Sequence, residues 1–271
     1  MSDRTRDRRI ASILTLLAQR GEVKVRLLPS MLRVSGATVR RDLAVLEEKG
    51  LIRRSYGKIA AARSGAELPV SLRRSQNSEA KRRIGALASS LIPVSRPLTV
   101  ALGSGSTVGF VAKSLASRSG LTVVTNGLDT AASLMARSVV EVVVTGGIAR
   151  PLSNDLVGET VEKTLRSCRF DFAVVGADGV SPAVGLTRYS HRGAETDRAM
   201  LERAEHRIVV VDSSKLGRVH QAKIAGMSSV DTIVTDSHAN PDMVASFRSM
   251  GIHTTLVVVP SASIGRRARS A

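Results

Sequence analysis

The chain has very few aromatic residues and a single cysteine. Its 271 residues include no Trp, two Tyr and four Phe, so a packed interior has to consist of Val, Leu, Ile and Ala. One cysteine, Cys168, excludes an internal disulfide, and scarce cysteine is typical of proteins in a reducing cytosol. We expect Cys168 to be an inert, half-buried thiol.

Metal-binding and membrane-spanning patterns are also absent from the sequence. The five histidines are scattered and lack the spacing of metal ligands, so we predict neither a metal site nor a cofactor. The longest apolar runs are far shorter than the ~18 residues of a membrane span, and the charged N-terminus has no apolar signal segment. These features predict a cytoplasmic protein with no membrane segment.

Positive charge, by contrast, is abundant and unevenly distributed. Residues 1–83 contain 20 Lys and Arg against 8 Asp and Glu, a net charge of +12, whereas residues 84–271 contain 20 against 15, a net charge of +5. A basic part joined to a larger, nearly neutral part indicates a polyanion as the partner of the basic part. A basic surface that only confers solubility is the alternative that charge alone leaves open.

The first sixty residues contain the pattern of three short helices. The first helix ends at Gly21 and repeats apolar residues at helical spacing, namely Ile10, Ile13, Leu14 and Leu17. The second carries Leu27, Leu28, Met31 and Leu32. We expect it to begin near Val25 or Arg26, because Pro29 lacks an N–H and fits only the first turn.

The third helix has one face for packing and another suited to DNA. Ser35 can cap its N-terminus, and an apolar stripe of Val39, Leu43 and Leu46 leaves small and basic residues in solvent. Small residues permit close approach to a major groove, where arginine binds guanine or phosphate. Residues 51–60 read as a two-stranded wing with its turn at Gly57-Lys58. The residues predicted to contact DNA are Ser35, Ala37, Thr38, Arg40, Arg41, Arg53, Arg54 and Lys58.

The segment VSGATVRRDLAVLEEKGLIRR (34–54) resembles the signature of the DeoR family of bacterial transcription regulators. The resemblance implies a winged helix-turn-helix and places Ser35, Thr38, Arg40 and Arg41 at double-stranded operator DNA. The wing differs from the family's His-Gly-Gly-Ala, because the chain has Tyr-Gly-Lys-Ile at 56–59. A three-helix module for protein contacts is the alternative.

The second part of the chain has the pattern of a parallel sheet. Residues 61–78 lack a sustained period and read as a linker, and continuous β-branched runs then alternate with helix-length segments. Such runs are typical of strands buried on both faces of a mainly parallel, Rossmann-like α/β sheet. The runs are 98–102, 121–125, 141–146, 171–176, 207–212, 231–236 and 254–259. We divide the chain into a winged helix-turn-helix domain (1–62), a linker (63–79), an effector domain (80–260) and a basic disordered tail (261–271).

Glycines and hydroxyl residues follow five of these runs. Ligands of parallel sheets bind beyond the carboxyl ends of the strands, and free N–H groups at a helix start can hold an anion. The loop GSGSTV (103–108) lacks the third glycine of a dinucleotide fingerprint and the lysine of a P-loop. Each loop alone reads as an ordinary turn, but five at one edge of a sheet favour a shared site.

The second part also resembles DeoR-type effector domains, which are similar to ribose-5-phosphate isomerases. The resemblance implies that the Gly-Ser loop binds phosphate and that a phosphorylated sugar is the effector. Together with the loop pattern, it gives the predicted effector site Gly103, Ser104, Gly105, Ser106, Thr107, Asn126, Gly147, Asp178, Glu195 and Lys215. Tyr189, His191 and Arg192 are candidates for contacts with sugar hydroxyls.

Isomerase chemistry is largely missing from these residues. Aldose–ketose isomerisation needs a carboxylate base, yet Val175 stands where the isomerases carry a catalytic Asp, and Thr187 or Arg188 where they carry Lys. The sequence therefore favours a sugar-phosphate-responsive regulator, a repressor of a carbohydrate operon without catalytic residues, acting as a homo-oligomer. The alternatives are an isomerase-like enzyme with a DNA-binding module and an architectural DNA-binding protein.

Overall fold

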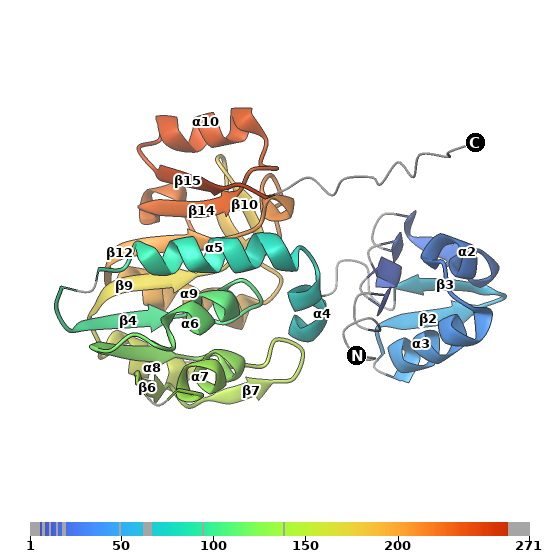
Figure 1. Ribbon diagram of the computed structural model, residues 1–271, viewed down its shortest axis with the longest axis horizontal. Coiled ribbons are helices and arrows are strands. Elements are labelled where there is room, and N and C mark those ends of the chain that lie inside the picture. Colours follow the sequence, from blue (N-terminus) through green and yellow to red (C-terminus); the bar gives the residue numbers. More distant parts are fainter. Residues whose placement is uncertain are drawn as a thin grey trace, which may run out of the picture.

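The computed structural model contains a small winged-helix lobe and a larger α/β lobe, with a short helix, α4, between them (Figure 1). It describes residues 6, 9–10, 12–14, 16–17, 20–48, 50–61, 67–93, 95–137 and 139–259. The predicted tail at 261–271 and the predicted domain boundary at 62 lie outside the described residues.

The winged-helix lobe has the predicted three-helix core and wing. After β1 (Glu22–Lys24) come a 3-10 helix (Val25–Leu27), α2 (Leu28–Leu32), α3 (Gly36–Glu48), β2 (Ile52–Ser55) and β3 (Lys58–Ala61). The strands form an antiparallel sheet in the order β1-β3-β2. The predicted apolar faces of the first and third helices are buried together in one core, with Ile13, Leu17, Leu43 and Leu46 at most 2% exposed. In the second helix Leu28 is buried, but Leu27 and Met31 are 44% and 37% exposed.

Other local details of this lobe also differ from the sequence prediction, which had only the two strands of the wing and no β1. The wing turn is Tyr56-Gly57 rather than Gly57-Lys58, because Ser55 pairs with Lys58 and both turn residues have positive φ, 44° and 73°. These angles are those of a type I′ hairpin turn. The second α-helix begins at Leu28, after the 3-10 turn that starts at Val25, and Pro29 lies in its first turn as its chemistry requires.

The larger lobe is built on the seven predicted strands. They are β4 (Leu98–Leu102), β5 (Leu121–Thr125), β6 (Glu141–Val144), β9 (Phe170–Val175), β12 (Ala204–Val210), β14 (Thr232–Asp236) and β15 (His253–Val257). All neighbouring pairs are parallel, in the order β15-β14-β12-β9-β4-β5-β6. The chain therefore builds the sheet outward from β4 to β6, then returns to β9 and builds the other half. This reversal puts the topological switch point between β4 and β9.

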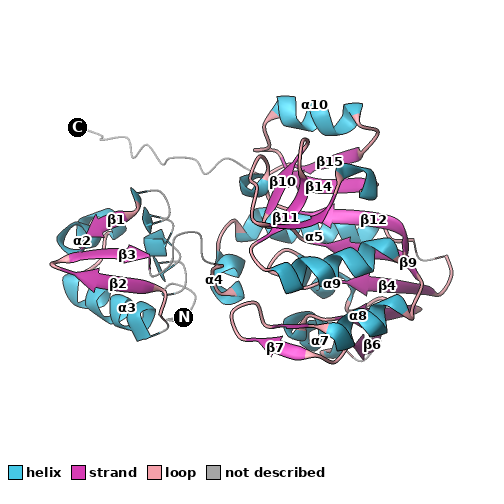
Figure 2. Ribbon diagram, turned by 180° about the vertical axis from the view of Figure 1, so that it is seen from behind, coloured by secondary structure: helices cyan, strands magenta, loops and turns pink. Residues whose placement is uncertain are grey.

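Helices cover both faces of the sheet, as the continuous apolar strands predict (Figures 1 and 2). On one face lie α5 (Ser78–Ser90), α6 (Val108–Leu115) and α7 (Leu128–Met135). On the other lie α8 (Glu159–Arg166), α9 (His191–Glu202) and α10 (Pro241–Ser249). Every helix in the described segments is too short or too polar to cross a membrane.

Several short elements are absent from the sequence prediction. They are the hairpin of β7 (Ile148–Arg150) and β8 (Asp155–Val157), the antiparallel strands β10 (Gly179–Ser181), β11 (Gly185–Arg188) and β13 (Ala222–Ala225), and 3-10 turns at Ser213–Lys215 and Met227–Ser229. The predicted linker also contains a helix, α4 (Val70–Ser75), and α5 begins within it at Ser78. Residues 67–79 are therefore structured rather than a plain connector.

The wing turn gives a test of backbone strain. A non-glycine residue at positive φ costs stability, and Asn-Gly is the preferred pair of a type I′ turn. We expect Tyr56→Asn to stabilise the winged-helix lobe by about 1 kcal/mol, measured as slower hydrogen exchange of the amides in β2 and β3.

Gly57→Ala is the matched control. An added Cβ at Gly57 meets nothing within 4 Å, so the φ of +73° alone should make this change destabilising. Unchanged exchange in Tyr56→Asn would contradict the assigned strain.

Candidate DNA-binding surface and anion pocket

The N-terminal end of α3 exposes the side chains that the sequence predicts for DNA contact. The Ser35 hydroxyl accepts a hydrogen bond from the Thr38 N–H at 3.2 Å, as expected for an N-cap. Ser35, Arg40 and Arg41 are exposed, while Ala37 and Thr38 are half-buried. The capped helix start therefore presents a small, polar and basic surface to solvent.

The cations of this surface differ in how strongly they are held. Arg54 pairs with Glu47 at 2.9 Å, and Lys58 pairs with Glu22 at 2.5 Å. Arg41 and Arg53 have no partner among the described residues and are exposed. Free guanidinium groups are available to bases and phosphates at once, whereas the paired cations first have to leave a carboxylate.

The α/β lobe has a pocket at the switch point of the sheet. The pocket is small, with a cavity volume of about 30 Å³, and it opens to solvent. It is formed by the loops that follow β4, β9 and β12, the three adjacent central strands. Its lining is Arg73, Ser104, Gly105, Ser106, Thr107, Val108, Gly176, Ala177, Asp178, Arg188, Val210 and Lys215.

Backbone N–H groups in this pocket lack protein acceptors. The N–H groups of Gly105, Ser106, Thr107 and Val108, at the start of α6, donate to no acceptor among the described residues. Gly105 adopts φ +117°, and an added Cβ there would meet nothing within 4 Å, so the backbone faces open space. The positive end of the helix dipole and its unpaired N–H groups favour an anion at this point.

The hydroxyl groups of the same loop divide into two roles. Ser106 and Thr107 are 7% and 8% exposed, and their hydroxyls have no partner among the described residues. Ser104 instead donates to the Asp155 carboxylate at 2.8 Å, which joins the Gly-Ser loop to the β7–β8 hairpin. Ser106 and Thr107 are thus free for a bound anion, and Ser104 positions the loop.

Cations surround the loop from other elements. The Lys215 ammonium has no hydrogen-bond or ion-pair partner in the described part of the chain. Burial lowers the pKa of Lys215, and the nearby Asp178 and Asp212 oppose this shift. Arg188, on β11, forms a fully buried ion pair with Asp197 of α9. Burial raises the pKa of Asp197 to about 6, although Arg188 opposes this shift.

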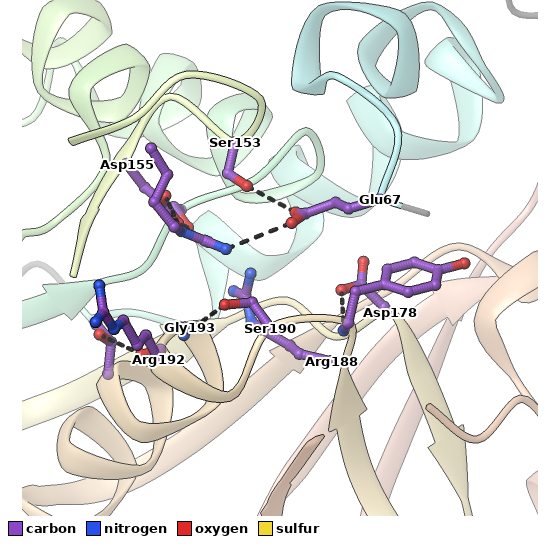
Figure 3. Close-up of polar contacts among 12 residues, drawn as sticks. Glu67, Ser153, Asp155, Asp178, Arg188, Ser190, Arg192 and Gly193 are labelled. Carbon is purple, nitrogen blue, oxygen red and sulfur yellow. Dashed lines mark hydrogen bonds and ion pairs between the residues drawn. The ribbon is translucent and has the colours of Figure 1, made fainter. Parts of the chain in front are cut away.

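Asp178 is the carboxylate of the pocket lining. Burial favours its neutral form, but Arg73, Arg188 and Lys215 outweigh this effect and lower the pKa of Asp178. The Tyr189 N–H also donates to it, at 3.3 Å (Figure 3). An ionised Asp178 accepts hydrogen bonds, so it can bind the hydroxyl of a polyol beside the anion site.

The structure also brings into the pocket residues that the sequence analysis missed. Arg73, from α4, lies 3.4 Å from Asp178 and 3.0 Å from Glu67. Glu67 in turn accepts from Ser153 at 2.7 Å (Figure 3) and lies 3.4 Å from Arg150. The aperiodic segment around Arg73 carries no pattern that links it to a loop more than a hundred residues away. The sequence analysis compared Arg188 with the lysine of the isomerases and did not predict it as a pocket residue.

Four predicted effector residues do not line the pocket. The Gly103 N–H donates to the Val174 carbonyl at 3.0 Å, so Gly103 still pairs with β9 at the end of β4. Asn126 donates to the Leu156 carbonyl at 2.9 Å, and Gly147 packs against Val157 and Val161, so both support the β7–β8 hairpin and α8. Glu195 is exposed on α9, because the buried face of that helix carries Ala194 and Asp197 instead. The loops after β4, β9 and β12 converge as expected, and those after β5 and β6 serve the neighbouring hairpin.

The positions that the sequence analysis compared with isomerase residues are Val175, Thr187 and Arg188. Val175 is buried in the core. The Thr187 hydroxyl donates to the Gly179 carbonyl at 3.2 Å. Arg188 forms the ion pair with Asp197 described above. The described residues contain no group of three or more His, Cys, Asp or Glu that could hold a metal ion.

Two family models match the chain. Residues 9–64 match the DeoR-like helix-turn-helix domain, and residues 76–237 match the DeoR C terminal sensor domain. Residues 65–75, which include α4, lie between the two matches. The domain order agrees with the winged helix and the α/β lobe described above.

Curated relatives match along most of the chain. The glycerol-3-phosphate regulon repressor of Escherichia coli K12 is 32% identical over 225 residues, which cover 83% of this chain and 88% of the relative. The putative aga operon transcriptional repressor of Escherichia coli O157:H7 is 32% identical over 248 residues, 90% of this chain and 91% of the relative. A ribose-5-phosphate isomerase in complex with phospho-erythronic acid aligns at 21% identity and a TM-score of 0.39, covering 51% of this chain and 54% of its own.

The exposed, unpaired Arg41 provides a test of the DNA surface. We expect Arg41→Ala to weaken binding to a duplex selected from a random-sequence pool by ~1–3 kcal/mol, the cost of one base contact. Fluorescence anisotropy measures the affinity, and circular dichroism checks that the fold is retained.

Arg166→Ala, an exposed arginine of α8 in the other lobe, is the matched control and should bind like wild type. If Arg41→Ala binds normally while Arg53→Ala does not, the wing rather than α3 reads the sequence.

Proposed function

The chain belongs to the DeoR family of transcription regulators, and from this premise we propose that it represses a carbohydrate-utilisation operon under the control of a phosphorylated sugar. The winged helix binds double-stranded operator DNA through the N-terminal end of α3 and the wing. The printed names of the relatives, repressors of a glycerol-3-phosphate regulon and of the aga operon, support a carbohydrate target. The α/β lobe binds the effector.

The observation that carries this proposal is the set of unpaired N–H groups at the start of α6. In the proposed complex the phosphate accepts hydrogen bonds from Gly105, Ser106, Thr107 and Val108, and Lys215 pairs with it from the loop after β12. Asp178 accepts a hydrogen bond from a sugar hydroxyl. Phosphate binds through charge, and the hydroxyl contacts confer specificity.

Binding without turnover is the second part of the proposal. Isomerisation needs a group that takes a proton from carbon. Asp178 is a weak base because three neighbouring cations lower its pKa, and Asp197 is occupied by Arg188. The alternative, an enzyme with a DNA-binding module, has no other carboxylate in the pocket lining.

Self-association is proposed for the same lobe. β6 is an edge strand of the seven-stranded sheet, and its neighbourhood exposes Val143, Val144 and Ile148 at 39%, 40% and 61%. Unpaired apolar edge strands favour pairing with another chain, and two winged helices would read two half-sites of an operator. A monomer in sedimentation at micromolar concentration, with and without DNA, would contradict this proposal.

A screen of small molecules tests the effector. We expect pentose and hexose phosphates to raise the melting temperature of the protein in a saturable way, because a ligand that binds only the folded state stabilises it. The matching unphosphorylated sugars should give no shift. Product analysis of the same mixtures distinguishes a sensor from an enzyme, since turnover of any of these compounds would support the alternative.

Ser106→Asp tests the location of the phosphate. A carboxylate at this position occupies the proposed phosphate site and repels the phosphate. The thermal shift and the effector response in a DNA-release assay should therefore be lost. DNA affinity without effector should stay within about tenfold of wild type, since the winged helix is a separate domain.

Ser119→Asp adds the same charge to an exposed residue beyond the far end of α6 and should respond like wild type. A normal response of Ser106→Asp would place the phosphate elsewhere. A folded Ser106→Asp variant that no longer binds DNA would indicate that the carboxylate mimics the ligand.

A further inference from the structure

The segment between the two matched domains is attached to both lobes. Leu72 is 5% exposed and belongs to the buried core of the winged helix, against which Leu68 also packs. The other side of the segment contacts the α/β lobe, where the Val70 N–H donates to the Leu152 carbonyl at 2.7 Å and Arg74 pairs with Asp129 at 2.6 Å. Residues 67–75 are therefore a structural bridge, which lies outside both family matches.

Arg73 lies on the effector side of this bridge and inside the anion pocket. Its side chain is 9% exposed and lines the pocket together with the start of α6 and Lys215. One guanidinium nitrogen, Nη1, lies 3.4 Å from Asp178, and the other, Nη2, lies 3.0 Å from Glu67. The third, Nε, is buried and has no hydrogen-bond partner within the described ranges. A buried donor without a partner is costly, and here it belongs to a residue that lines the proposed phosphate site.

The charges of the pocket lining are not balanced. The lining contains three cations, Arg73, Arg188 and Lys215, against the single carboxylate Asp178. Behind the lining, carboxylates compensate three nearby cations: Asp197 pairs with Arg188, Glu67 lies 3.0 Å from Arg73, and Asp212 lies 3.6 Å from Lys81, which also donates to the Arg73 carbonyl at 2.5 Å. Lys215 has no ion-pair partner among the described residues. A phosphate in the pocket would therefore meet an excess of positive charge at the lining itself.

We infer that Arg73 is a ligand of the effector's phosphate, and that its movement from Asp178 and Glu67 to the phosphate transmits the bound state to the winged helix through α4. This inference rests on the proposed function. Leu72 precedes Arg73 in α4, a helix of six residues, and packs in the core of the winged-helix lobe. A shift of the Arg73 side chain therefore acts on a helix that contacts both lobes. Glu67 loses one partner in the same step and keeps its contacts with Ser153 and Arg150 of the β7–β8 hairpin.

The binding half of the inference is tested with inorganic phosphate as the probe, by calorimetry against chloride at equal ionic strength. We expect Arg73→Gln to weaken phosphate binding roughly tenfold or more, as for one charge-assisted contact. Arg73→Lys keeps the charge but not the forked geometry. Its phosphate affinity should therefore lie between those of wild type and Arg73→Gln. If Arg73→Gln does not fold, the lysine variant decides the question.

Arg74→Gln is the matched control, because Arg74 is the next residue of α4 and pairs with Asp129 outside the pocket. It should bind phosphate within about twofold of wild type, as surface ion pairs contribute little. Equal phosphate affinity in Arg73→Gln and Arg74→Gln, both folded, would overturn the assignment of Arg73.

The transmission half is tested with Leu72→Ala. This change removes packing against the winged helix and leaves the pocket lining unaltered, so phosphate binding should persist. DNA release by the phosphosugar that gives the largest thermal shift should be reduced. A wild-type release response in Leu72→Ala would overturn transmission through α4.

Failure of the proposed function gives a different result. In that case wild-type protein binds neither inorganic phosphate nor any phosphosugar of the screen, and the role of Arg73 is overturned with it. Failure of the inference alone leaves wild-type binding intact and shows no difference between the Arg73 and Arg74 variants.

Discussion

The reversal of strand order between β4 and β9 determines where this chain can hold an anion. The connections that leave these two strands run to opposite faces of the sheet, so their loops separate and leave a crevice at the carboxyl edge. The start of α6 lies at this crevice with N–H groups that have no acceptor among the described residues. Lys215 reaches the same crevice from the loop after β12, the strand beside β9. The Arg73 side chain enters the same space, which is how a residue from outside the sheet comes to line the pocket.

The sequence was informative where structure depends on local patterns. Continuous β-branched runs identified all seven strands of the main sheet, and Ser35 marked the start of α3 because capping is a contact over three residues. The short antiparallel strands and α4 were missed, since they depend on tertiary contacts and have too few residues for a period. Arg73 meets Asp178 across 105 positions of the chain, a distance over which spacing carries no information.

Glycine-rich loops were the least certain guide to the site. Gly-Ser sequences after β4 and the Asn-Gly and Gly-Gly pairs after β5 and β6 look alike in sequence, because tight turns and anion sites use the same small residues. Only the strand order separates them, since β4 borders the switch point and the other two do not. The pocket combines N–H groups at the start of α6, which have no acceptor among the described residues, with the buried Arg188–Asp197 pair. The fold alone does not determine which chemistry such a site performs.

The carboxylate partners of Arg54 and Lys58 limit how tightly the winged helix holds arbitrary DNA. A cation that binds a DNA phosphate gains affinity by releasing counterions from the duplex. Arg54 and Lys58 are already compensated by Glu47 and Glu22, and those acids remain beside the duplex after the exchange, where they repel it. The net charge of residues 1–83 therefore overstates the attraction to random sequence. In the proposed DNA complex, self-compensated contacts of this kind reduce the time that the protein spends on the excess of non-target sites in a chromosome.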